Sequence, residues 1–269
     1  MSEKAEELEE SDVKSEVRRE SKRVKKVEEY FQWETLKDWE KEMYFDFVKT
    51  AKKTWTNNGY DDEEVEKTVL NKISLLRFCI ARDFHPEKAF KMWISWVEWR
   101  LEYQPHKIKW REVKNSSLNK CFYLCGQNKK GCPLIVICPG ATSEVYDIDL
   151  MWKLAAYVME KACRRADRNG TTQMCVIFDR TNMNNGVEKK WLPLYKQLST
   201  LIQDYYPERL HQAYVLHMNW FARVIFQLCK PFIAKKTRNK LIILANQDHL
   251  EDHVDTEVYD PRNPHSFKE

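Results

Sequence analysis

Long apolar runs are missing from this chain of 269 residues, and so is a surplus of charge of one sign. The longest purely apolar runs lie near Leu134–Cys138 and Leu241–Ala245, far short of the ~20 residues that a membrane-spanning helix needs. The acidic N-terminus lacks the apolar segment of a signal peptide. With 45 basic and 41 acidic residues the formal net charge is +4, which disfavours nucleic acid as a partner, because such partners require a strongly basic surface. We therefore expect a cytoplasmic protein.

Glycine is also scarce, and the six glycines are not spaced as in a dinucleotide-binding fingerprint. The turn Cys138–Ser143 lacks the Gly-Lys-Ser/Thr ending of a phosphate-binding loop. No Ser lies in a Gly-x-Ser-x-Gly elbow, so a hydrolase of the α/β type is disfavoured. Cys175 precedes Arg180 but falls inside an expected strand, which argues against a cysteine phosphatase. We expect no enzymatic activity and no catalytic residue.

Metal-binding patterns are equally weak. Cys121, Cys125 and Cys132 form the only cysteine cluster, and no His or fourth Cys lies at zinc spacing. His249 and His253 could share one side of a helix, although a solvated acidic C-terminal segment is the ordinary interpretation. We expect no metal and no cofactor, and we interpret the eight cysteines as free thiols in a reducing compartment.

Residues 1–30 are dense in Glu, Lys and Arg. Valines at 13, 17, 24 and 27 form their only apolar ladder, and Glu20 interrupts its helical spacing. An isolated helix of this composition would be marginal in water. The pattern predicts either a charged, solvated arm or a helix that forms on a partner.

Residues 31–110 carry three apolar patterns with helical spacing. The first ends at the turn Asn57-Asn58-Gly59, and Thr35 with Asp38 precedes it like a cap. The second is expected to be one helix from about Val65 to Ile80, and Pro86 opens the third. We expect a small all-helical unit whose helices are marked by apolar stripes along Leu36, Trp39, Met43, Phe47, Ala51, Val65, Val69, Ile73, Leu76, Ile80, Phe90, Trp93, Val97 and Leu101.

Residues 111–269 alternate short apolar runs with helical patterns. Such alternation is typical of βαβ units and of a mostly parallel sheet. The fold class expected is therefore α/β, with the helical unit packed on it. The expected strands are Leu134–Cys138, Met174–Phe178, Ala213–Leu216 and Leu241–Leu244.

The segment Leu75–Phe84, with Glu87-Lys88-Ala89 after it, resembles the opening of the CRAL-TRIO family, which includes phosphatidylinositol transfer proteins and the carriers of tocopherol and retinaldehyde. The resemblance spans about residues 65–250. It continues through Gly131-Cys132-Pro133-Leu134, Val176-Ile177-Phe178-Asp179, Tyr205-Tyr206-Pro207-Glu208-Arg209, Asn219, Cys229-Lys230-Pro231-Phe232 and Lys240–Leu244.

The resemblance implies a lipid-binding domain whose sheet floors a deep hydrophobic cavity, closed by a mobile amphipathic helix, the gate. That helix would begin near Trp220 and place Phe221, Ile225, Leu228 and Phe232 on one apolar stripe. An ordinary core helix would show the same periodicity. The acid-free basic run after it, with Lys235 and Lys236, favours contact with an anionic membrane surface.

The resemblance also implies the residues that hold a lipid headgroup. The positions used by phosphatidylinositol binders match Arg82, Glu208 and Lys240. Asp83 departs from the basic residue common after that Arg, so we expect weaker electrostatic attraction of the headgroup. Choline-lipid binders place two hydroxyl side chains where this chain has Met174 and Val176, so phosphatidylcholine is disfavoured.

These observations predict a peripheral membrane protein that binds one phospholipid, most simply phosphatidylinositol, and transfers or presents it as a monomer. A carrier of a sterol or an isoprenoid is the nearest alternative. A regulatory module that senses lipid without transferring it is the third, and residues 1–30 are the feature that favours it.

Overall fold

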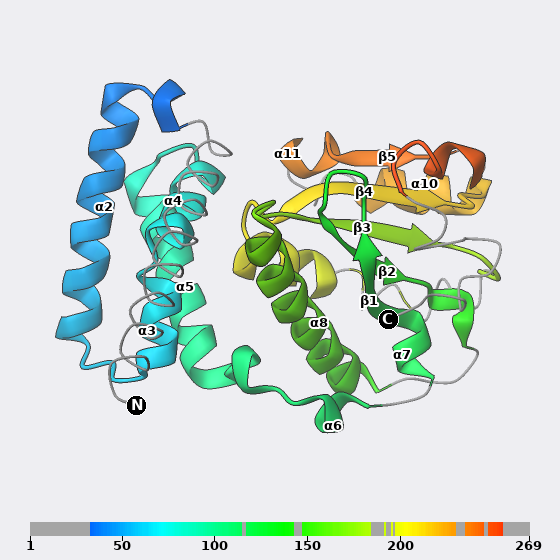
Figure 1. Cartoon of the computed structure of the whole chain (residues 1–269), viewed down its shortest axis with the longest axis horizontal. Helices are drawn as coiled ribbons and strands as arrows, with labels where there is room; N and C mark the ends of the chain where they lie inside the picture. The colour runs from blue at the N-terminus through cyan, green and yellow to red at the C-terminus, as the bar shows by residue number, and fades with distance from the viewer. Residues whose placement is uncertain are drawn as a thin grey trace, which may run out of the picture.

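The structure, a computed structural model, describes residues 33–114, 117–142, 147–183, 191, 195, 197–229, 235–244 and 247–254. Figure 1 shows a group of helices at one end of the molecule and a sheet flanked by helices at the other. The helical part comprises η1 (Trp33–Thr35), α2 (Asp38–Asn57), α3 (Glu63–Val69), α4 (Lys72–Ala81) and α5 (Pro86–Tyr103). The connection to the sheet contains η2 (Pro105–Lys107), α6 (Trp110–Val113) and α7 (Leu118–Cys121).

The first long helix, α2, is capped differently from the expectation. Its N-cap residue is Lys37, whose backbone N–H donates to the Glu40 carboxylate at 2.8 Å. The proposed cap at Thr35 and Asp38 is therefore wrong, because a carboxylate three residues inside the helix satisfies the first free N–H group. The C-terminal end agrees with the sequence, and Gly59 has a φ of 65°, which glycine adopts without strain.

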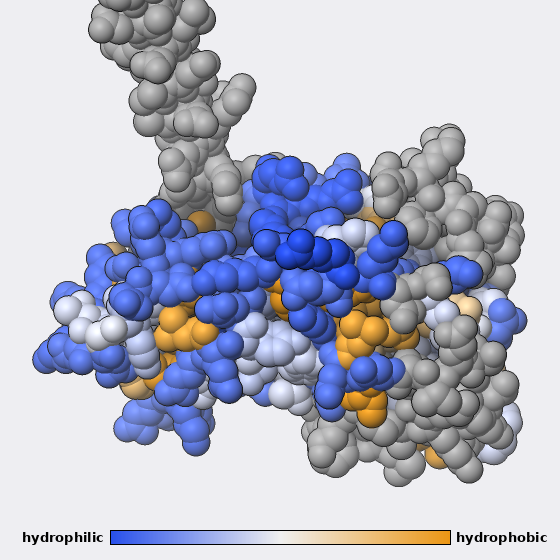
Figure 2. Space-filling model, turned by 90° about the horizontal axis from the view of Figure 1, so that it is seen from below, coloured by the Kyte–Doolittle hydropathy of each residue, from blue (hydrophilic) through white to orange (hydrophobic). Residues whose placement is uncertain are grey.

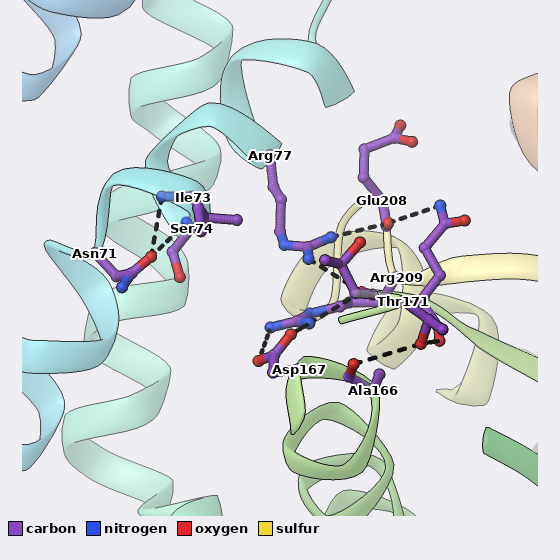
Figure 3. Close-up of polar contacts among 11 residues, drawn as sticks. Asn71, Ile73, Ser74, Arg77, Ala166, Asp167, Thr171, Glu208 and Arg209 are labelled. Atoms are coloured by element: carbon purple, nitrogen blue, oxygen red, sulfur yellow. Dashed lines mark hydrogen bonds and ion pairs between the residues drawn. The ribbon is translucent and has the colours of Figure 1, made fainter. Parts of the chain in front are cut away.

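The single helix expected from Val65 to Ile80 is two helices, α3 and α4. Asn71 divides them, because its side-chain oxygen accepts hydrogen bonds from the backbone N–H groups of Ile73 at 2.9 Å and Ser74 at 3.3 Å (Figure 3). An Asn side chain offers the backbone an alternative to continued helix and starts a new one. The apolar spacing continues across Asn71 and therefore did not predict this break.

An aromatic core holds the helical part together. Trp93 on α5 is completely buried, packs edge-on against Phe47 of α2, and donates its indole N–H to the Val69 carbonyl at 3.1 Å. Phe78 of α4 packs against Trp96. These contacts join four helices, so the apolar stripes of the sequence meet as expected.

Within the described residues the sheet has five strands in the order β1-β2-β3-β4-β5, and of these only β1 is antiparallel to its neighbour. This confirms a mostly parallel α/β fold. β1 was missed from the sequence. It joins β2 through a tight turn at Asn128, whose side chain accepts N–H bonds from Lys130 and Cys132. The strands are β1 (Phe122–Gln127), β2 (Pro133–Ile137), β3 (Met174–Asp179), β4 (Leu210–Leu216) and β5 (Leu241–Ile243).

Helix α8 (Ile148–Asn169) covers one face of the sheet (Figure 1). Ile135 and Ile137 of β2 and Met174 and Val176 of β3 pack on that face, because alternate residues of a strand point to the same side. The opposite face buries a second cluster of strand residues. The remaining described elements are η3 (Pro139–Ala141), η4 (Leu201–Tyr205), α10 (Trp220–Cys229), α11 (Lys235–Arg238) and η6 (Gln247–Leu250).

A buried polar network joins the two parts. Arg100 of α5 donates two hydrogen bonds to the Glu160 carboxylate of α8, at 2.9 and 3.1 Å, and Tyr206 donates a third at 2.8 Å. Burial disfavours the charged form of Glu160 and raises its pKa, but Arg100 and Tyr206 together hold the pKa of this carboxyl group below the usual value. Trp99 stacks on Tyr205 beside this network, with ring centroids 4.3 Å apart.

Candidate functional site

The residues expected to hold a headgroup lie where the two parts meet. Glu208 lies just before β4 and Lys240 directly before β5. Because β4 and β5 are parallel neighbours, the starts of these strands share one edge of the sheet. The Lys240 Nζ is 3.5 Å from the Glu208 carboxylate, and the two side chains are 26% and 18% exposed. The structure thus brings two of the three predicted residues together.

Arg82 reaches the same segment through a different residue. It is the C-cap of α4, and its guanidinium lies 3.8 Å from the carboxylate of Asp204, four residues before Glu208. Burial raises the pKa of the Asp204 carboxyl group, and Arg82 partly opposes this rise. Arg82 therefore flanks the Glu208–Lys240 pair without a direct contact to it among the described interactions.

The backbone at Glu208 is in an unusual conformation that two other side chains hold. Its φ is 55°, a left-handed value that costs a residue with a Cβ about 1 kcal/mol. Arg77 and Gln173 both donate hydrogen bonds to the Glu208 carbonyl, at 3.0 and 3.1 Å. In Figure 3 the Arg77 guanidinium points from α4 to the backbone of Glu208, whose carboxylate points away. The carboxylate is therefore free of Arg77 and available to Lys240.

A second arginine ties this segment to α8. Arg209 donates to the Asp167 carboxylate at the end of α8, including a bond of 3.1 Å, and to the Thr172 carbonyl at 3.0 Å. Arg77 shares that carbonyl, also at 3.0 Å. The turn that carries Glu208 is thus fixed from both α4 and α8.

Sequence reasoning missed the positioning roles of Arg77, Gln173 and Arg209. A signal existed for Arg77, because it is a charged residue inside the apolar run Leu75–Ile80. Such a residue must find partners when it is buried. Gln173 and Arg209 carry no comparable signal, since their partners lie tens of residues away in the chain.

The unusual residue Asp83 has a partner in the basic run after the gate. The Lys236 Nζ lies 2.5 Å from the Asp83 carboxylate and also donates to the Ile80 carbonyl at the end of α4, at 2.9 Å. Lys235, its neighbour on α11, is exposed. Of the two lysines expected to dock on a membrane, one is bound to the helical part and one faces solvent.

The expected gate coincides with α10. The side chains of Phe221, Ile225 and Leu228 lie outside the described residues, and so does Phe232 altogether, so their stripe stays a prediction. The described side chains of α10 belong to another face. Trp220 is 74% and Val224 48% exposed, and Arg223 and Gln227 are exposed beside them.

On the side seen in Figure 2 the described residues are mainly hydrophilic, and their apolar areas are small and separate. Among the described residues, no helix is long and apolar enough to cross a membrane. Within the same residues, no three His, Cys, Asp or Glu side chains lie close enough to hold a metal ion.

Two family profiles match the chain in succession. The profile described as "CRAL/TRIO, N-terminal domain" matches residues 24–95, and the "CRAL/TRIO domain" profile matches residues 118–260, which is more than half of the chain. The chain belongs to the CRAL/TRIO family. The resemblance inferred from Leu75–Phe84 and the later segments is confirmed.

Several curated CRAL/TRIO relatives are similar over about two thirds of this chain. "Patellin-5" of Arabidopsis thaliana is 24% identical over 185 residues, which are 63% of this chain and 27% of that protein. "SEC14 cytosolic factor" of Yarrowia lipolytica is 26% identical over 204 residues, 70% of this chain and 40% of that protein. The chain thus spans less than half of the length of these relatives.

A solved structure confirms the CRAL/TRIO fold. The structure titled "Crystal structure of Sfh5" superposes with a TM-score of 0.69, covers 83% of this chain and 85% of its own, and is 21% identical. That similarity concerns the fold alone. Family membership, with SEC14 and patellin relatives, supports the binding and transfer of a lipid or another small ligand.

Proposed function

We propose that this CRAL/TRIO protein binds one phospholipid molecule, preferentially phosphatidylinositol, and transfers or presents it between membranes without chemical change. The observation that carries the proposal is the partly buried Glu208–Lys240 pair at the sheet edge, with Arg82 held by Asp204 in the same segment as Glu208. Two cations can neutralise a phosphodiester, while a carboxylate accepts hydrogen bonds from inositol hydroxyl groups.

The need for an enclosed site follows from the chemistry of such a ligand. A two-tailed lipid carries roughly thirty methylene groups, and exposing each to water costs about 0.8 kcal/mol. Escape of a free lipid is then opposed by some 20 kcal/mol or more by the same estimate. A carrier must offer an equally apolar environment, which we assign to the side of the sheet covered by α8.

The interior of that side favours inositol over choline lipids. Met174 and Val176 both face the α8 side and are 1% and 8% exposed. Neither offers the hydroxyl group that a choline-lipid site is expected to need. We therefore propose that phosphatidylcholine is a poor ligand.

Contact with membranes is assigned to α10 and α11. Trp220 and Val224 form an exposed apolar pair on α10 with the exposed Arg223, and α11 adds the exposed Lys235. Indole rings prefer the membrane interface, and each base near an anionic surface contributes about 1 kcal/mol. We propose a monomeric cytoplasmic protein that docks peripherally and transiently through this face.

The test is transfer of phosphatidylinositol between vesicles by the wild type, Glu208→Ala and Lys240→Ala. Both variants should lose most of the transfer activity and retain the wild-type melting temperature. Glu112→Ala and Lys153→Ala are the controls, because these residues form another, more exposed ion pair, 2.8 Å apart, between α6 and α8. Transfer that is undiminished in both site variants would refute the assignment.

Native mass spectrometry of the purified protein, followed by lipid extraction, separates the alternatives. A bound sterol or isoprenoid would favour the neutral-ligand carrier, which the mutual neutralisation of Glu208 and Lys240 could also accommodate. A bound phospholipid without transfer activity would favour the lipid-sensing module.

A further inference from the structure

A hollow of about 520 Å³ lies on the helical part, away from the Glu208–Lys240 pair, between the N-terminal halves of α2 and α5. Apolar side chains form most of its lining: Trp39, Met43, Phe47, Pro86 and Phe90. Trp39 is 50% exposed, and its ring packs edge-on against Phe84 with the ring centroids 6.1 Å apart. The hollow is thus an apolar groove that the described residues leave open.

The rim of this groove is acidic. Glu42, Asp46 and Glu87 line it, and no Lys or Arg does. Asp46 pairs with Lys49 at 3.2 Å, whereas Glu42 and Glu87 form no ion pair among the described residues. An apolar floor with an uncompensated acidic rim fits a segment that combines apolar side chains with positive charge.

The chain itself contains such a segment directly before the described residues. Residues 14–26 hold seven Lys or Arg and two Glu, a formal net charge of +5. Val17, Val24 and Val27 provide apolar side chains at helical spacing. Residues 1–12, by contrast, hold six acids and one Lys. The positive charge that complements the acidic rim therefore lies in residues 14–26.

The residues between this segment and Trp33 are long enough for the segment to reach the groove. The described chain starts at Trp33, whose ring packs on Tyr44 and Phe45 of α2 at 5.2 and 5.9 Å. Tyr44 and Phe45 adjoin Met43 and Asp46, which line the groove. Five residues of extended chain span roughly 16 Å, more than the ~10 Å diameter of a helix, so residues 14–27 can cross α2 into the groove. Tethering also raises their effective concentration to about the millimolar range.

We propose that residues 14–27 dock into the acidic-rimmed groove between α2 and α5 of their own chain. The valines contact Met43, Phe47 and Phe90, and the basic side chains face Glu42 and Glu87. This interaction is independent of the identity of the bound lipid.

Limited proteolysis of the full chain with trypsin tests the proposal, because trypsin cleaves after the seven basic residues of the segment. Docked residues resist cleavage. Glu42→Lys with Glu87→Lys reverses the charge of the rim and should speed cleavage in residues 14–26 about tenfold at low salt, since each pair of exposed charges contributes modestly. Val17→Asp with Val24→Asp should have the same effect from the other side of the contact.

Glu98→Lys with Glu102→Lys is the matched control, because both residues are exposed on α5 outside the groove and the charge change is equal. This control should keep the wild-type cleavage rate, and the thermal melting of all variants should agree. Equal cleavage in the wild type and in the Val17→Asp, Val24→Asp protein would overturn the proposal. Protection that survives reversal of the rim, or that depends on protein concentration, would overturn it too, because the segment would then bind elsewhere or on a second copy.

Discussion

At the scale of single residues, the backbone carbonyl and the carboxylate of Glu208 have different partners. Arg77 and Gln173 hold its carbonyl oxygen, and its carboxylate points away from them toward Lys240. A left-handed backbone persists only where the surroundings fix it, and here the buried side chains of Arg77 and Gln173 do so. Arg77 and Arg82, five residues apart on α4, therefore have different tasks.

Replacing Arg77 should reduce stability, and replacing Arg82 should not. Arg77 is 3% exposed, and Arg77→Ala leaves the carbonyl groups of Glu208 and Thr172 with fewer donors, so the free energy of unfolding should fall by about 1–3 kcal/mol. Arg82→Ala removes a half-exposed pair and should cost less than about 0.5 kcal/mol. Urea denaturation measures both. Equal losses in the two variants would contradict the division of tasks.

His106 should make stability depend on pH. Its side chain is 5% exposed, and burial, followed by repulsion from Arg100, lowers the pKa of its imidazole. Because the folded pKa lies below the ordinary value of about 6.5, the unfolded chain binds the proton first, and stability is lost as the pH falls below about 7. Between pH 7.5 and pH 5.5, which lie about one unit above and below the ordinary pKa of histidine, His106→Gln should lose less stability than the wild type. Urea midpoints at these two pH values measure the effect, and exposed His85→Gln should match the wild type.

At the scale of elements, α11 is attached to the end of α4. Lys236 contacts Asp83 and the Ile80 carbonyl, where a cation also interacts favourably with the helix dipole. The Lys236 and Asp83 side chains are 50% and 81% exposed, so their pairing is weak. An anionic surface can compete with Asp83 for this lysine.

Asp83→Asn should strengthen binding to anionic vesicles. The change frees Lys236 and is compatible with the φ of 50° at this position, since Asn tolerates left-handed backbone. We expect binding about two- to threefold tighter at low salt, with the gain lost at high salt. Vesicle sedimentation measures it. Glu63→Gln, which frees Lys67 on α3, is the control, and an equal gain there would mean that only net charge matters.

At the scale of the whole molecule, Arg100, Glu160 and Tyr206 connect the helical part to the sheet. Glu160→Gln should lower the free energy of unfolding by about 3–5 kcal/mol, because it leaves the buried Arg100 without a counter-ion. The double variant Arg100→Met with Glu160→Met should recover much of this loss, since apolar residues of similar volume can replace a buried ion pair. Chemical denaturation of the three proteins measures the series. A loss below about 1 kcal/mol in Glu160→Gln would show that Arg100 does not depend on its partner.

The sequence predicted most of the fold because apolar periodicity is a local signal. The parallel strands β2 to β5 and helices α2, α5 and α10 all lie where the sequence indicates a strand or a helix. The break at Asn71 was missed since a single side-chain cap overrides spacing, and β1 was missed since its run contains Gly126 and Gln127.

The candidate site was less accessible to sequence reasoning. Arg82, Glu208 and Lys240 came from the family resemblance, and strand order explains why Glu208 and Lys240 meet. The residues that position the site could not be predicted, because Arg77 and Glu208 are separated by 131 residues in the chain and Arg100 and Glu160 by 60. Local patterns do not specify such distant partners.

The double attachment of the Glu208 turn has a thermodynamic consequence. Arg77 connects that turn to the helical part, and Arg209 connects it to α8. If a headgroup binds this turn only when both attachments are intact, its binding also stabilises both attachments, because coupling between two equilibria is reciprocal. Bound lipid would then raise the free energy needed to separate the helical part from the sheet. Conversely, a force or a partner that separates these two parts would release the lipid.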